Sequence, residues 1–402
     1  MSANEAADNQ PADSSNGLSD LDLPEGLITE EALEDLRRLT GLQMRPERYI
    51  REATIDTVMN FCNGIGDLNP LHRDEEYAKW TRWGEMLAPS CFLYAHTWPG
   101  RTRFGLPGVH GFHAGNDFRF ECPVRIGDRI DSVERMIGFE EKESRFSGKL
   151  VILHVETTFT NQRGEHIATV RGWNTRHERA AARERGKETR DDSVTGGGHT
   201  YDYQAEELFK IEEAQYTEDE RIRGANTRYW EDIQVGDKLE PIARGPLTTS
   251  DVTAWLVGTG RGRAHGAALK EARRHPGHYF RNPDAGQGLE YTGMGHQLRE
   301  VAAQVGVPGA YDFGPQRISW AGTLVENWMG DDGFLTRLRG ELRGFNLMGD
   351  TTWLSGIVSK TYWENDEALV DIEIRGENQR GRLTLPGLAT VRLPSKLVPD
   401  TL

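Results

Sequence analysis

The sequence predicts an α+β fold made of two similar halves. In each half a short helical segment (54–62 and 249–257) precedes a long irregular excursion, a second helix and then β-rich stretches. Helices segregated from a mostly antiparallel meander are typical of α+β proteins rather than of doubly wound sheets. Strands predicted to end at Gly127-Asp128 and at Gly349-Asp350 introduce the β-rich part of each half. We interpret this correspondence as a degenerate internal repeat.

The domain limits follow from composition. Residues 1–25 are acidic and carry no Lys or Arg, which predicts a disordered leader. The first helix is expected to begin at Thr29, an N-cap residue followed by two Glu and by leucines at helical spacing. A first domain is predicted over 26–177 and a second over 226–396. Between them, a charged run that passes into three glycines predicts a linker over 178–225.

Turn residues and alternation fix the remaining elements. Pro89 lies in the first turn of a predicted central helix that runs to Trp98. The alternating run 150–160 predicts a strand that turns over 161–164, and the run 354–363 with the turn 364–366 is its counterpart in the second half.

Composition excludes several classes of function. The 402 residues include 63 Asp+Glu against 48 Lys+Arg, and a net charge of -15 opposes non-specific attraction to nucleic acid or anionic lipid. No apolar run approaches the roughly 20 residues of a membrane span, so a cytoplasmic location is the default expectation. Cys62, Cys91 and Cys122 lack CxxC spacing and predict neither a disulfide framework nor a zinc site.

The most informative segment is Gly66-Asp67-Leu68-Asn69-Pro70-Leu71-His72. Its glycine and proline end the preceding helix, so Asp67 and His72 lie on an irregular turn. Side chains five residues apart diverge on a helix, whereas on a turn they can converge. A carboxylate and an imidazole that reach one small molecule are suited to moving the proton of a water molecule.

A Gly-Asp-x-Asn-Pro sequence is also an ordinary turn signal, in which Asp and Asn bond their own backbone. We interpret Gly127-Asp128, Gly236-Asp237 and Gly349-Asp350 as turns only. The full pattern that includes His72 is much rarer, and the functional hypothesis depends on it.

Residues 66–74 resemble the signature of the MaoC-like family of (R)-specific enoyl-CoA hydratases and 3-hydroxyacyl thioester dehydratases, and residues 75–90 resemble the stretch that follows it. The family fold is the hot dog, a long central helix wrapped by a curved antiparallel sheet. Two-domain members carry two hot dogs in one chain. The resemblance therefore implies two hot-dog domains here, in agreement with the repeat.

The resemblance also implies roles for single residues. Asp67 and His72 occupy the positions of the acid–base pair that adds water across the α,β double bond of an enoyl thioester, or removes it in reverse. Asn69 is expected to hold the turn and the water in place. An enolate oxygen that develops in the reaction needs donors, and we expect the backbone N–H groups of Ser90 and Cys91 to supply them. Coenzyme A is expected as part of the substrate, with no other cofactor and no metal.

The second half has no Asp-x-Asn-Pro-x-His. With the two Gly-Asp turns superposed, the equivalent region falls within 284–296. We therefore predict one active site, in the first half, with the second hot dog completing its shape and housing the acyl chain. The Gly- and His-rich excursion 261–295 is expected to wall the pocket.

Three weaker patterns point elsewhere. The Gly-rich run 258–266 follows a helix and lacks Gly-Lys-Ser/Thr, which argues against nucleotide binding. The pairs His110/His113 and His275/His278 lack a metalloprotease frame and are interpreted as structural. Arginines near the Gly-rich run suit either a coenzyme A phosphate or a solvated basic face. They are Arg261, Arg263, Arg273 and Arg274.

Two other functions stay open. An acyl-CoA thioesterase would use Ser90 or Cys91 as nucleophile, although no Gly-x-Ser-x-Gly surrounds Ser90. A non-catalytic acyl-CoA-binding subunit of a hetero-oligomeric hydratase would retain the motif by descent. The acyl group is not fixed by the sequence, and neither is the carrier, although an acidic chain favours coenzyme A over an acidic carrier protein. A double hot dog mimics a dimer of single ones, so a monomer and a homodimer are both consistent with it.

Overall fold

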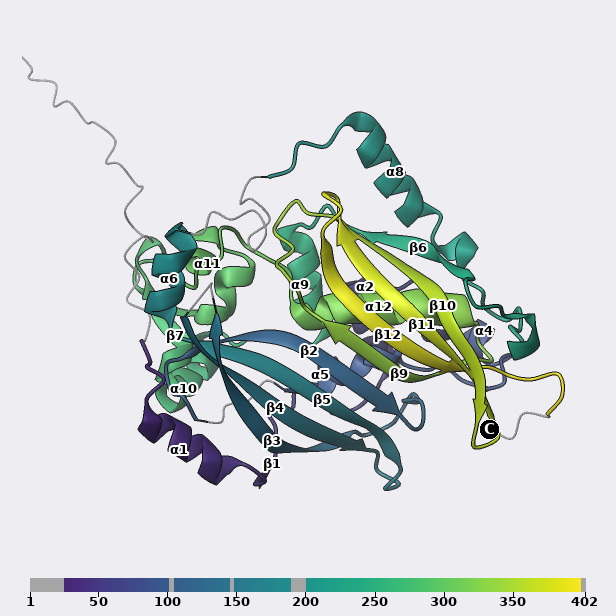
Figure 1. Ribbon diagram of the computed structural model, residues 1–402, viewed down its shortest axis with the longest axis horizontal. Coiled ribbons are helices and arrows are strands. Elements are labelled where there is room, and N and C mark those ends of the chain that lie inside the picture. The colour runs from purple at the N-terminus through teal and green to yellow at the C-terminus, as the bar shows by residue number, and fades with distance from the viewer. Residues whose placement is uncertain (1–24, 101–104, 145–147, 189–199, 399–402) are drawn as a thin grey trace, which may run out of the picture.

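The computed structural model describes residues 25–100, 105–144, 148–188 and 200–398. Within them, ten strands form one antiparallel sheet in the order β1-β3-β4-β5-β2-β9-β12-β11-β10-β6. The halves meet where β2 pairs with β9, with Phe118 opposite Leu338. Outward from this seam, the orders β2-β5-β4-β3-β1 and β9-β12-β11-β10-β6 mirror each other. The predicted α+β fold of two hot dogs is therefore confirmed, with both sharing one sheet (Figure 1).

The strands of the large sheet and of the small β7–β8 hairpin have the following bounds. They are β1 (Gln43–Met44), β2 (His110–Phe120), β3 (Asp131–Ser144), β4 (Gly148–Thr160), β5 (His166–His177), β6 (Lys238–Arg244), β7 (Tyr279–Asn282), β8 (Gly288–Tyr291), β9 (Phe334–Glu341), β10 (Thr352–Glu364), β11 (Glu367–Asn378) and β12 (Leu383–Arg392).

The helices divide between the two halves and the segment that joins them. They are α1 (Glu30–Leu39), α2 (Ile55–Ile65), α3 (Pro70–Arg73), α4 (Glu75–Ala78), η2 (Ser90–Phe92), α5 (Leu93–His96), α6 (Arg179–Glu188), α8 (Ala205–Tyr216), η3 (Asp219–Arg221), η4 (Trp230–Asp232), α9 (Thr249–Gly258), α10 (His265–Arg274), η5 (Pro276–His278), η6 (Pro283–Ala285), η7 (Thr292–His296), α11 (Arg299–Ala303) and α12 (Gly314–Met329).

The predicted leader and the predicted linker lie only partly within the described residues. The predicted disordered leader lies outside the described residues except for Glu25, and the domain limits stay predictions. Helix α1 begins as predicted, with the Thr29 hydroxyl accepting the Ala32 N–H at 3.2 Å. In the predicted linker, residues 189–199 lie outside the description, and α6 and α8 flank them. The linker is therefore partly helical.

The two strands predicted to end at the Gly-Asp pairs end several residues earlier in the structure, so their predicted ends are wrong. Strand β2 ends at Phe120 and β9 at Glu341. Pro123, which has no N–H to offer a ladder, follows the first of them closely. Gly127 and Gly349 both have φ +86. Each Gly-Asp pair therefore forms a turn that leads into the next long strand, β3 or β10.

The central helix predicted for the first half is shorter than expected. It consists of η2 and α5 and ends at His96 rather than at Trp98, with Thr97 extended at φ -152 and ψ 169. Pro99 keeps Trp98 out of the helix, because a residue before proline is disfavoured in the helical conformation.

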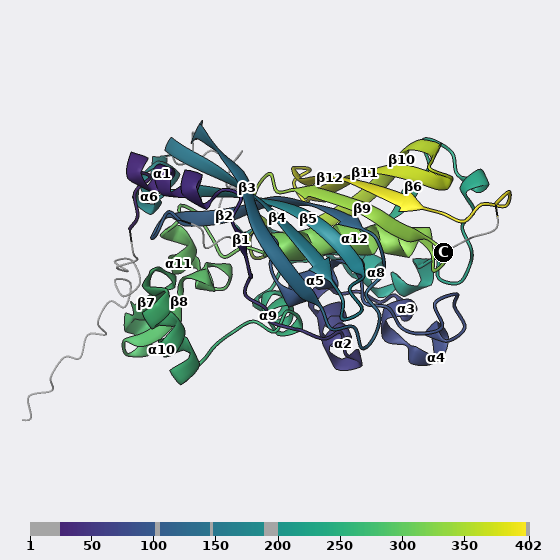
Figure 2. The same ribbon diagram turned by 90° about the horizontal axis from the view of Figure 1, so that it is seen from below.

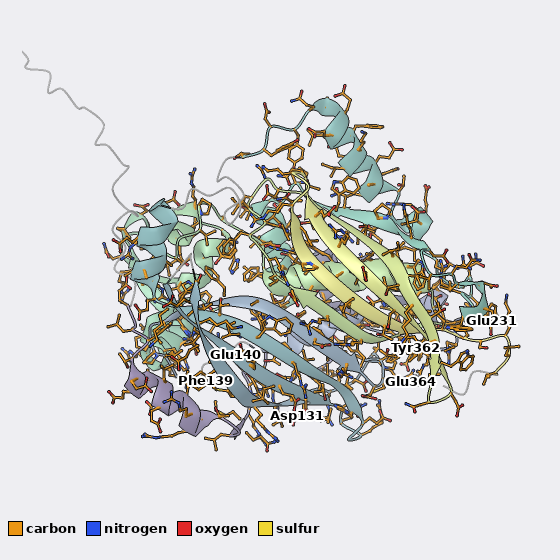
Figure 3. The ribbon with its side chains drawn as sticks, in the orientation of Figure 1. Asp131, Phe139, Glu140, Glu231, Tyr362 and Glu364 are labelled. Atoms are coloured by element: carbon orange, nitrogen blue, oxygen red, sulfur yellow. The ribbon has the colours of Figure 1, made fainter. Side chains whose placement is uncertain are left out.

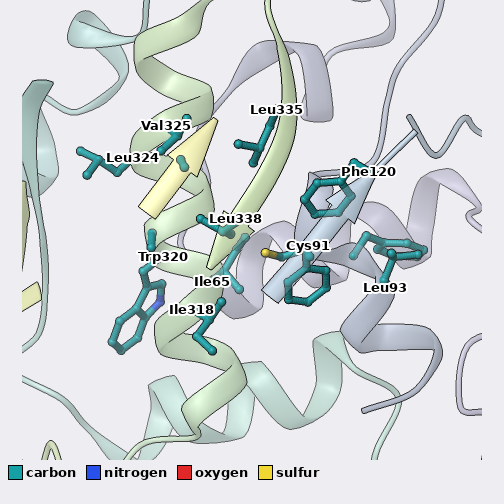
Figure 4. Packing of buried hydrophobic residues seen from close by; sticks show 14 of the residues in the cluster. Ile65, Cys91, Leu93, Phe120, Ile318, Trp320, Leu324, Val325, Leu335 and Leu338 are labelled. Atoms are coloured by element: carbon teal, nitrogen blue, oxygen red, sulfur yellow. The ribbon is translucent and has the colours of Figure 1, made fainter. Parts of the chain in front are cut away.

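The long buried helix is α12 of the second half, which starts with Pro315 in its first turn and stops at Gly330 with φ +76. It contacts β2 of the first half and β9 of the second, and Figure 2 shows it running beneath both. Its apolar side chains enter a core shared by the two halves. Figure 4 shows Ile318, Trp320, Leu324 and Val325 of α12 near Leu335 and Leu338 of β9 and near Ile65, Cys91, Leu93 and Phe120 of the first half.

The outer strand β3 carries charged side chains. Asp131 and Glu140 lie along it (Figure 3). Glu140 Oε1 lies 3.0 Å from His154 Nε2, and Asp131 pairs with Arg48.

In the described parts of the chain, no helix is long and apolar enough to cross a membrane.

The helices α2 and α9 that open the two halves pack on each other through glycines. A Cβ on Gly64 would lie 2.9 Å from the Ala254 carbonyl oxygen, and one on Gly258 would lie 2.6 Å from that of Asn60. Such distances are shorter than van der Waals contact. Only glycine therefore allows this close approach of the two backbones.

Replacing Gly64 with alanine should destabilise the protein by about 1–2 kcal/mol. Alanine usually gains about 0.5–1 kcal/mol over glycine inside a helix, but overpacking costs about 1–3 kcal/mol. Gly266 in α10 is a matched control, because a Cβ added there would meet nothing within 4 Å. Gly266→Ala should leave stability unchanged or slightly raise it. Urea unfolding measures both, and a Gly64→Ala protein as stable as the original would contradict this packing.

Candidate active site

The turn after α2 is shaped by its own sequence. Gly66 ends the helix in the left-handed conformation at φ +68. The Asp67 N–H then donates to the Cys62 carbonyl at 2.9 Å. Asn69 caps the short helix α3, because its Oδ1 accepts the Leu71 N–H at 3.0 Å, and Pro70 supplies the first helical residue. Asn69 therefore forms its cap bond within the turn, and its predicted role in holding the turn and the water in place stays a prediction.

This turn brings Asp67 and His72 into direct contact. His72 Nδ1 lies 2.7 Å from Asp67 Oδ2, and the Asn69 N–H donates to Asp67 Oδ1 at 2.9 Å. Both side chains are buried, with 1% of Asp67 and 3% of His72 exposed. The carboxylate fixes the imidazole through Nδ1, and Nε2 is the ring nitrogen left to exchange a proton with a bound molecule.

The pair stabilises its own charges. Burial alone raises the pKa of Asp67, but the His72 charge, its hydrogen bond and the Asn69 amide outweigh burial and hold that pKa below its usual value. Burial likewise lowers the pKa of His72, and the adjacent Asp67 carboxylate more than reverses this, so the pKa of His72 is raised. An ionised carboxylate beside a basic imidazole is the arrangement that favours proton transfer at Nε2.

His72 opens onto a pocket of about 40 Å³ between the two halves. Asp67 does not line it and instead supports His72 from behind. The first half provides most of the wall, with Leu71, His72, Trp83, Leu87, Ala88, Ser90, Phe120, Cys122, Pro123, Val124 and Ile167. The second half provides Glu326, Met329, Gly333, Phe334 and Leu335. Apart from His72, Ser90 and Glu326, the wall is largely apolar.

The lining corrects one prediction about the second half. No residue of the excursion 261–295 lines this pocket, so that segment does not wall it. The second hot dog contributes the end of α12 and the start of β9 to the wall, and its predicted role in housing the acyl chain stays a prediction.

The region of the second half that corresponds to the Asp67–His72 motif also differs from the prediction. The N-caps Thr54 and Thr248 and the glycines Gly64 and Gly258 have the same spacing in α2 and α9. The loop equivalent to the motif therefore directly follows α9 and starts near Arg261, not within 284–296. The superposition on the Gly-Asp turns gave the wrong position because, in the second half, an insertion between α9 and α12 lies between this loop and the Gly349-Asp350 turn.

The backbone at Ser90 is already engaged. Its N–H and its hydroxyl both donate to Glu326 Oε1, at 2.8 and 2.7 Å. The Ser90 N–H can therefore serve as an oxyanion donor only if this bond is exchanged for one to the substrate. Cys91, the other predicted donor, lies in η2 with its side chain buried against α12. The oxyanion role of Ser90 and Cys91 stays a prediction.

Glu326 was not predicted from the sequence. It lies on α12, 5% exposed, and faces the pocket with His72. Burial raises the pKa of its carboxyl group, which His72 lowers to a smaller extent and Asp67 raises further. The available signal was a single carboxylate in the otherwise uncharged run between Arg317 and Asp331.

The second half also anchors the turn itself. Arg244 of β6 forms two bonds with Glu218, with Nη1–Oε2 at 2.6 Å and Nη2–Oε1 at 2.9 Å. The same guanidinium donates to the carbonyls of Ile65 and Gly66, both at 3.1 Å. These carbonyls immediately precede Asp67, so the buried ion pair between Arg244 and Glu218 holds the backbone next to the Asp67–His72 pair.

The arginines considered for phosphate binding lie away from the pocket wall. The Arg261 guanidinium carbon lies 4.3 Å from the ring centroid of Tyr49, and Arg263 pairs with Glu47. Arg273 and Arg274 lie in the last turn of α10. Within the described residues, no group of three or more His, Cys, Asp or Glu side chains is placed to hold a metal ion.

Fold and site together define a double hot-dog protein with a buried Asp–His pair beside an apolar pocket. Residues 38–170 match the family model of the FAS1-like dehydratase domain region. This match covers most of the first hot dog and agrees with the resemblance of residues 66–74 to the MaoC-like signature.

Relatives among curated proteins match the first half. A UPF0336 protein of Streptomyces avermitilis is 25% identical over 130 residues, which are 29% of this chain and 79% of that protein. A mitochondrial 3-hydroxyacyl-[acyl-carrier-protein] dehydratase, FERN, of Solanum lycopersicum is 27% identical over 103 residues, or 26% of this chain and 61% of that protein.

Solved structures match across both halves. A MaoC-like dehydratase superposes with a TM-score of 0.60 at 15% identity and covers 89% of this chain and 100% of its own. A MaoC domain protein from Chloroflexus aurantiacus gives 0.51 at 14% identity and covers 89% of this chain and 96% of its own. At these identities the likeness shows the fold.

Proposed function

We propose that the protein catalyses the reversible hydration of an enoyl-CoA to an (R)-3-hydroxyacyl-CoA, with Asp67 and His72 as the acid–base pair. The observation that carries the proposal is the 2.7 Å contact between His72 Nδ1 and Asp67 Oδ2 at the wall of an apolar pocket. The match of residues 38–170 to a dehydratase domain supports the same reaction class.

In the proposed reaction the two residues have distinct tasks. His72 Nε2 exchanges a proton with the reacting molecule, because Nδ1 is taken by Asp67. Asp67 selects the tautomer of the ring and stabilises the imidazolium that forms, as a buried carboxylate does in other proton-transfer sites. The apolar wall holds the acyl group and limits access of bulk water.

The thioesterase alternative has less support. The Ser90 hydroxyl donates to Glu326 Oε1, so it is engaged with a carboxyl group rather than with an imidazole base. Burial raises the pKa of the Cys91 thiol, which works against formation of the reactive thiolate. Neither side chain is activated as a nucleophile usually is.

The pocket volume points to a short acyl group. A volume of about 40 Å³ holds only a few water molecules, each of which needs about 10–15 Å³ by the same measure. Phe120, Ile167 and Phe334 are among the bulky apolar residues that line it. Four-carbon enoyl thioesters should therefore be better substrates than long-chain ones.

The test is loss of the ultraviolet band of the enoyl thioester when the purified chain meets short, long, branched and carboxylated enoyl-CoAs. Release of free thiol is followed in the same samples. Loss of the band without thiol release supports hydration. Thiol release would instead favour the thioesterase, and tight binding without either change would favour the non-catalytic subunit.

Dehydration should gain activity as the pH rises, because it needs a neutral His72 that accepts the α-proton. The adjacent carboxylate raises the pKa of His72 above its ordinary value of 6.5, so the proton is retained to a higher pH than in a free imidazole. The midpoint of the acid limb of kcat/KM should therefore lie above 6.5. A midpoint below that value, with the protein folded throughout, would contradict the pairing with Asp67.

A further inference from the structure

We propose that Glu326 of the second hot dog is a second catalytic acid–base group and exchanges a proton with the substrate β-hydroxyl or the attacking water while His72 serves the α-carbon. This inference rests on the proposed function. It gives the second half, which lacks the motif, a chemical part in the site.

The position of Glu326 supports a direct role. It lies on α12, a helix that is buried along its length, and it lines the same pocket as His72. The Ser90 N–H and hydroxyl both donate to Oε1, at 2.8 and 2.7 Å. Two donors on one oxygen fix the carboxyl group and leave Oε2 for a proton or a ligand.

Burying a carboxyl group without a Lys or Arg partner costs free energy, and a catalytic role would explain why the group is there. Its two hydrogen bonds come from a neutral residue, and among the described residues no ion pair joins it to a Lys or Arg. The titratable groups that interact with it include His72, Asp67 and the thiols of Cys62 and Cys91.

The reaction needs two proton transfers, and two groups facing one pocket can divide them. In dehydration, His72 Nε2 takes the α-proton, the electron pair left on the α-carbon forms the double bond, and the bond from the β-carbon to oxygen breaks. The Glu326 carboxylic acid gives its proton to the departing hydroxide, which leaves as water. The chain is then left with a protonated His72 and an ionised Glu326.

Hydration starts from that second state and runs in reverse. The Glu326 carboxylate takes a proton from water as the oxygen bonds to the β-carbon, and protonated His72 delivers a proton to the α-carbon. The two starting states carry the same number of protons and differ only by transfer of one proton between the two residues. One pH therefore supports both directions. The raised pKa of Glu326 agrees with a carboxyl group that is able to hold a proton near neutrality.

Glu326→Gln tests the proposal, because the amide oxygen can still accept from Ser90 while the acid is lost. We expect kcat to fall by about 10²–10⁴-fold with little change in KM, and the limb of the pH profile that belongs to Glu326 to disappear. Glu326→Asp keeps the acid and shifts it, and it should retain part of the activity. Ser90→Ala removes one donor but not the acid, so its loss should be much smaller than that of Glu326→Gln.

The matched control is Glu134→Gln in β3. Glu134 is also a buried carboxylate, 4% exposed with its pKa raised by burial to about 8, but it does not line the pocket. This variant should keep the original kcat and pH profile.

The outcomes separate the two proposals. Full activity of Glu326→Gln with the original pH profile, while Asp67→Asn is inactive, would overturn the role of Glu326 and leave the hydratase standing. Equal losses in Glu326→Gln and Ser90→Ala would also overturn it, because they would indicate positioning only. Absence of turnover by the unaltered chain would overturn both. If Glu326→Gln shows no cooperative unfolding transition on heating, it is not folded. The partial activity and shifted pH profile expected of Glu326→Asp then test the role of Glu326 instead.

Discussion

Replacing Asp67 with asparagine should lower kcat for hydration by about 10²–10⁴-fold. The side chain keeps its size, and its oxygen can still accept the Asn69 N–H. The amide cannot stabilise a positive charge on His72, however, and it no longer selects the tautomer that presents Nε2 to the pocket. The measurement is kcat and KM for a short enoyl-CoA.

Asp128→Asn is the control for this change. Asp128 also follows a glycine in a Gly-Asp turn and is 1% exposed, and its Oδ2 accepts the Arg125 N–H at 3.0 Å. It lies outside the pocket wall. Its replacement should leave kcat near the original value, even if stability falls slightly. Equal activities of the two variants would contradict the catalytic assignment of Asp67.

Replacing Arg244 with methionine should destabilise the fold by about 3–5 kcal/mol, because it leaves the buried Glu218 carboxylate without its partner. The change also frees the Ile65 and Gly66 carbonyls that Arg244 holds at 3.1 Å. Since these groups precede Asp67, kcat should fall in the protein that remains folded. Urea unfolding gives the stability, and assays at low urea give kcat.

Arg343→Ala provides the comparison for an exposed pair. Arg343 donates to Glu341 but has 63% of its side chain exposed, and such surface pairs are worth about 0–1 kcal/mol. A loss for Arg244→Met as small as for Arg343→Ala would mean that the Glu218 pair does not anchor the turn.

The first half of the site could be predicted from the sequence because its parts are local. Gly66, Asn69 and Pro70 specify a helix end, a cap and a new helix start within five residues. Such signals depend on backbone chemistry alone. These local signals are enough to predict that Asp67 and His72 converge, and the structure has them in contact at 2.7 Å.

The contribution of the second half could not be predicted in this way. Glu326 lines the same pocket as His72 because α12 crosses beneath both halves. Arg244 of β6, at one edge of the shared sheet, donates to the carbonyls that precede Asp67 in the other half. Both contacts depend on how two domains dock, which no local pattern encodes. The position predicted for the loop equivalent to the motif was also wrong. The superposition assumed that the two halves have equal spacing between this loop and the Gly-Asp turn, whereas the second half carries an insertion after α9.

The length of the helix in the first half was predictable in retrospect. Pro89 starts it and Pro99 limits it, so at most a short helix fits between them. The long buried helix belongs to the second half, where no proline follows Pro315 before Gly330.

Water is expected to add across the double bond of an enoyl thioester at the Asp67–His72 site. The most direct measurement is nuclear magnetic resonance of a four-carbon enoyl-CoA treated with the purified chain in deuterated water, with Asp67→Asn beside it. We expect a 3-hydroxyacyl-CoA that carries one deuterium on the α-carbon, formed by the original protein and not by the variant. Unchanged substrate, a free enoic acid, or equal product from both proteins would contradict the assignment.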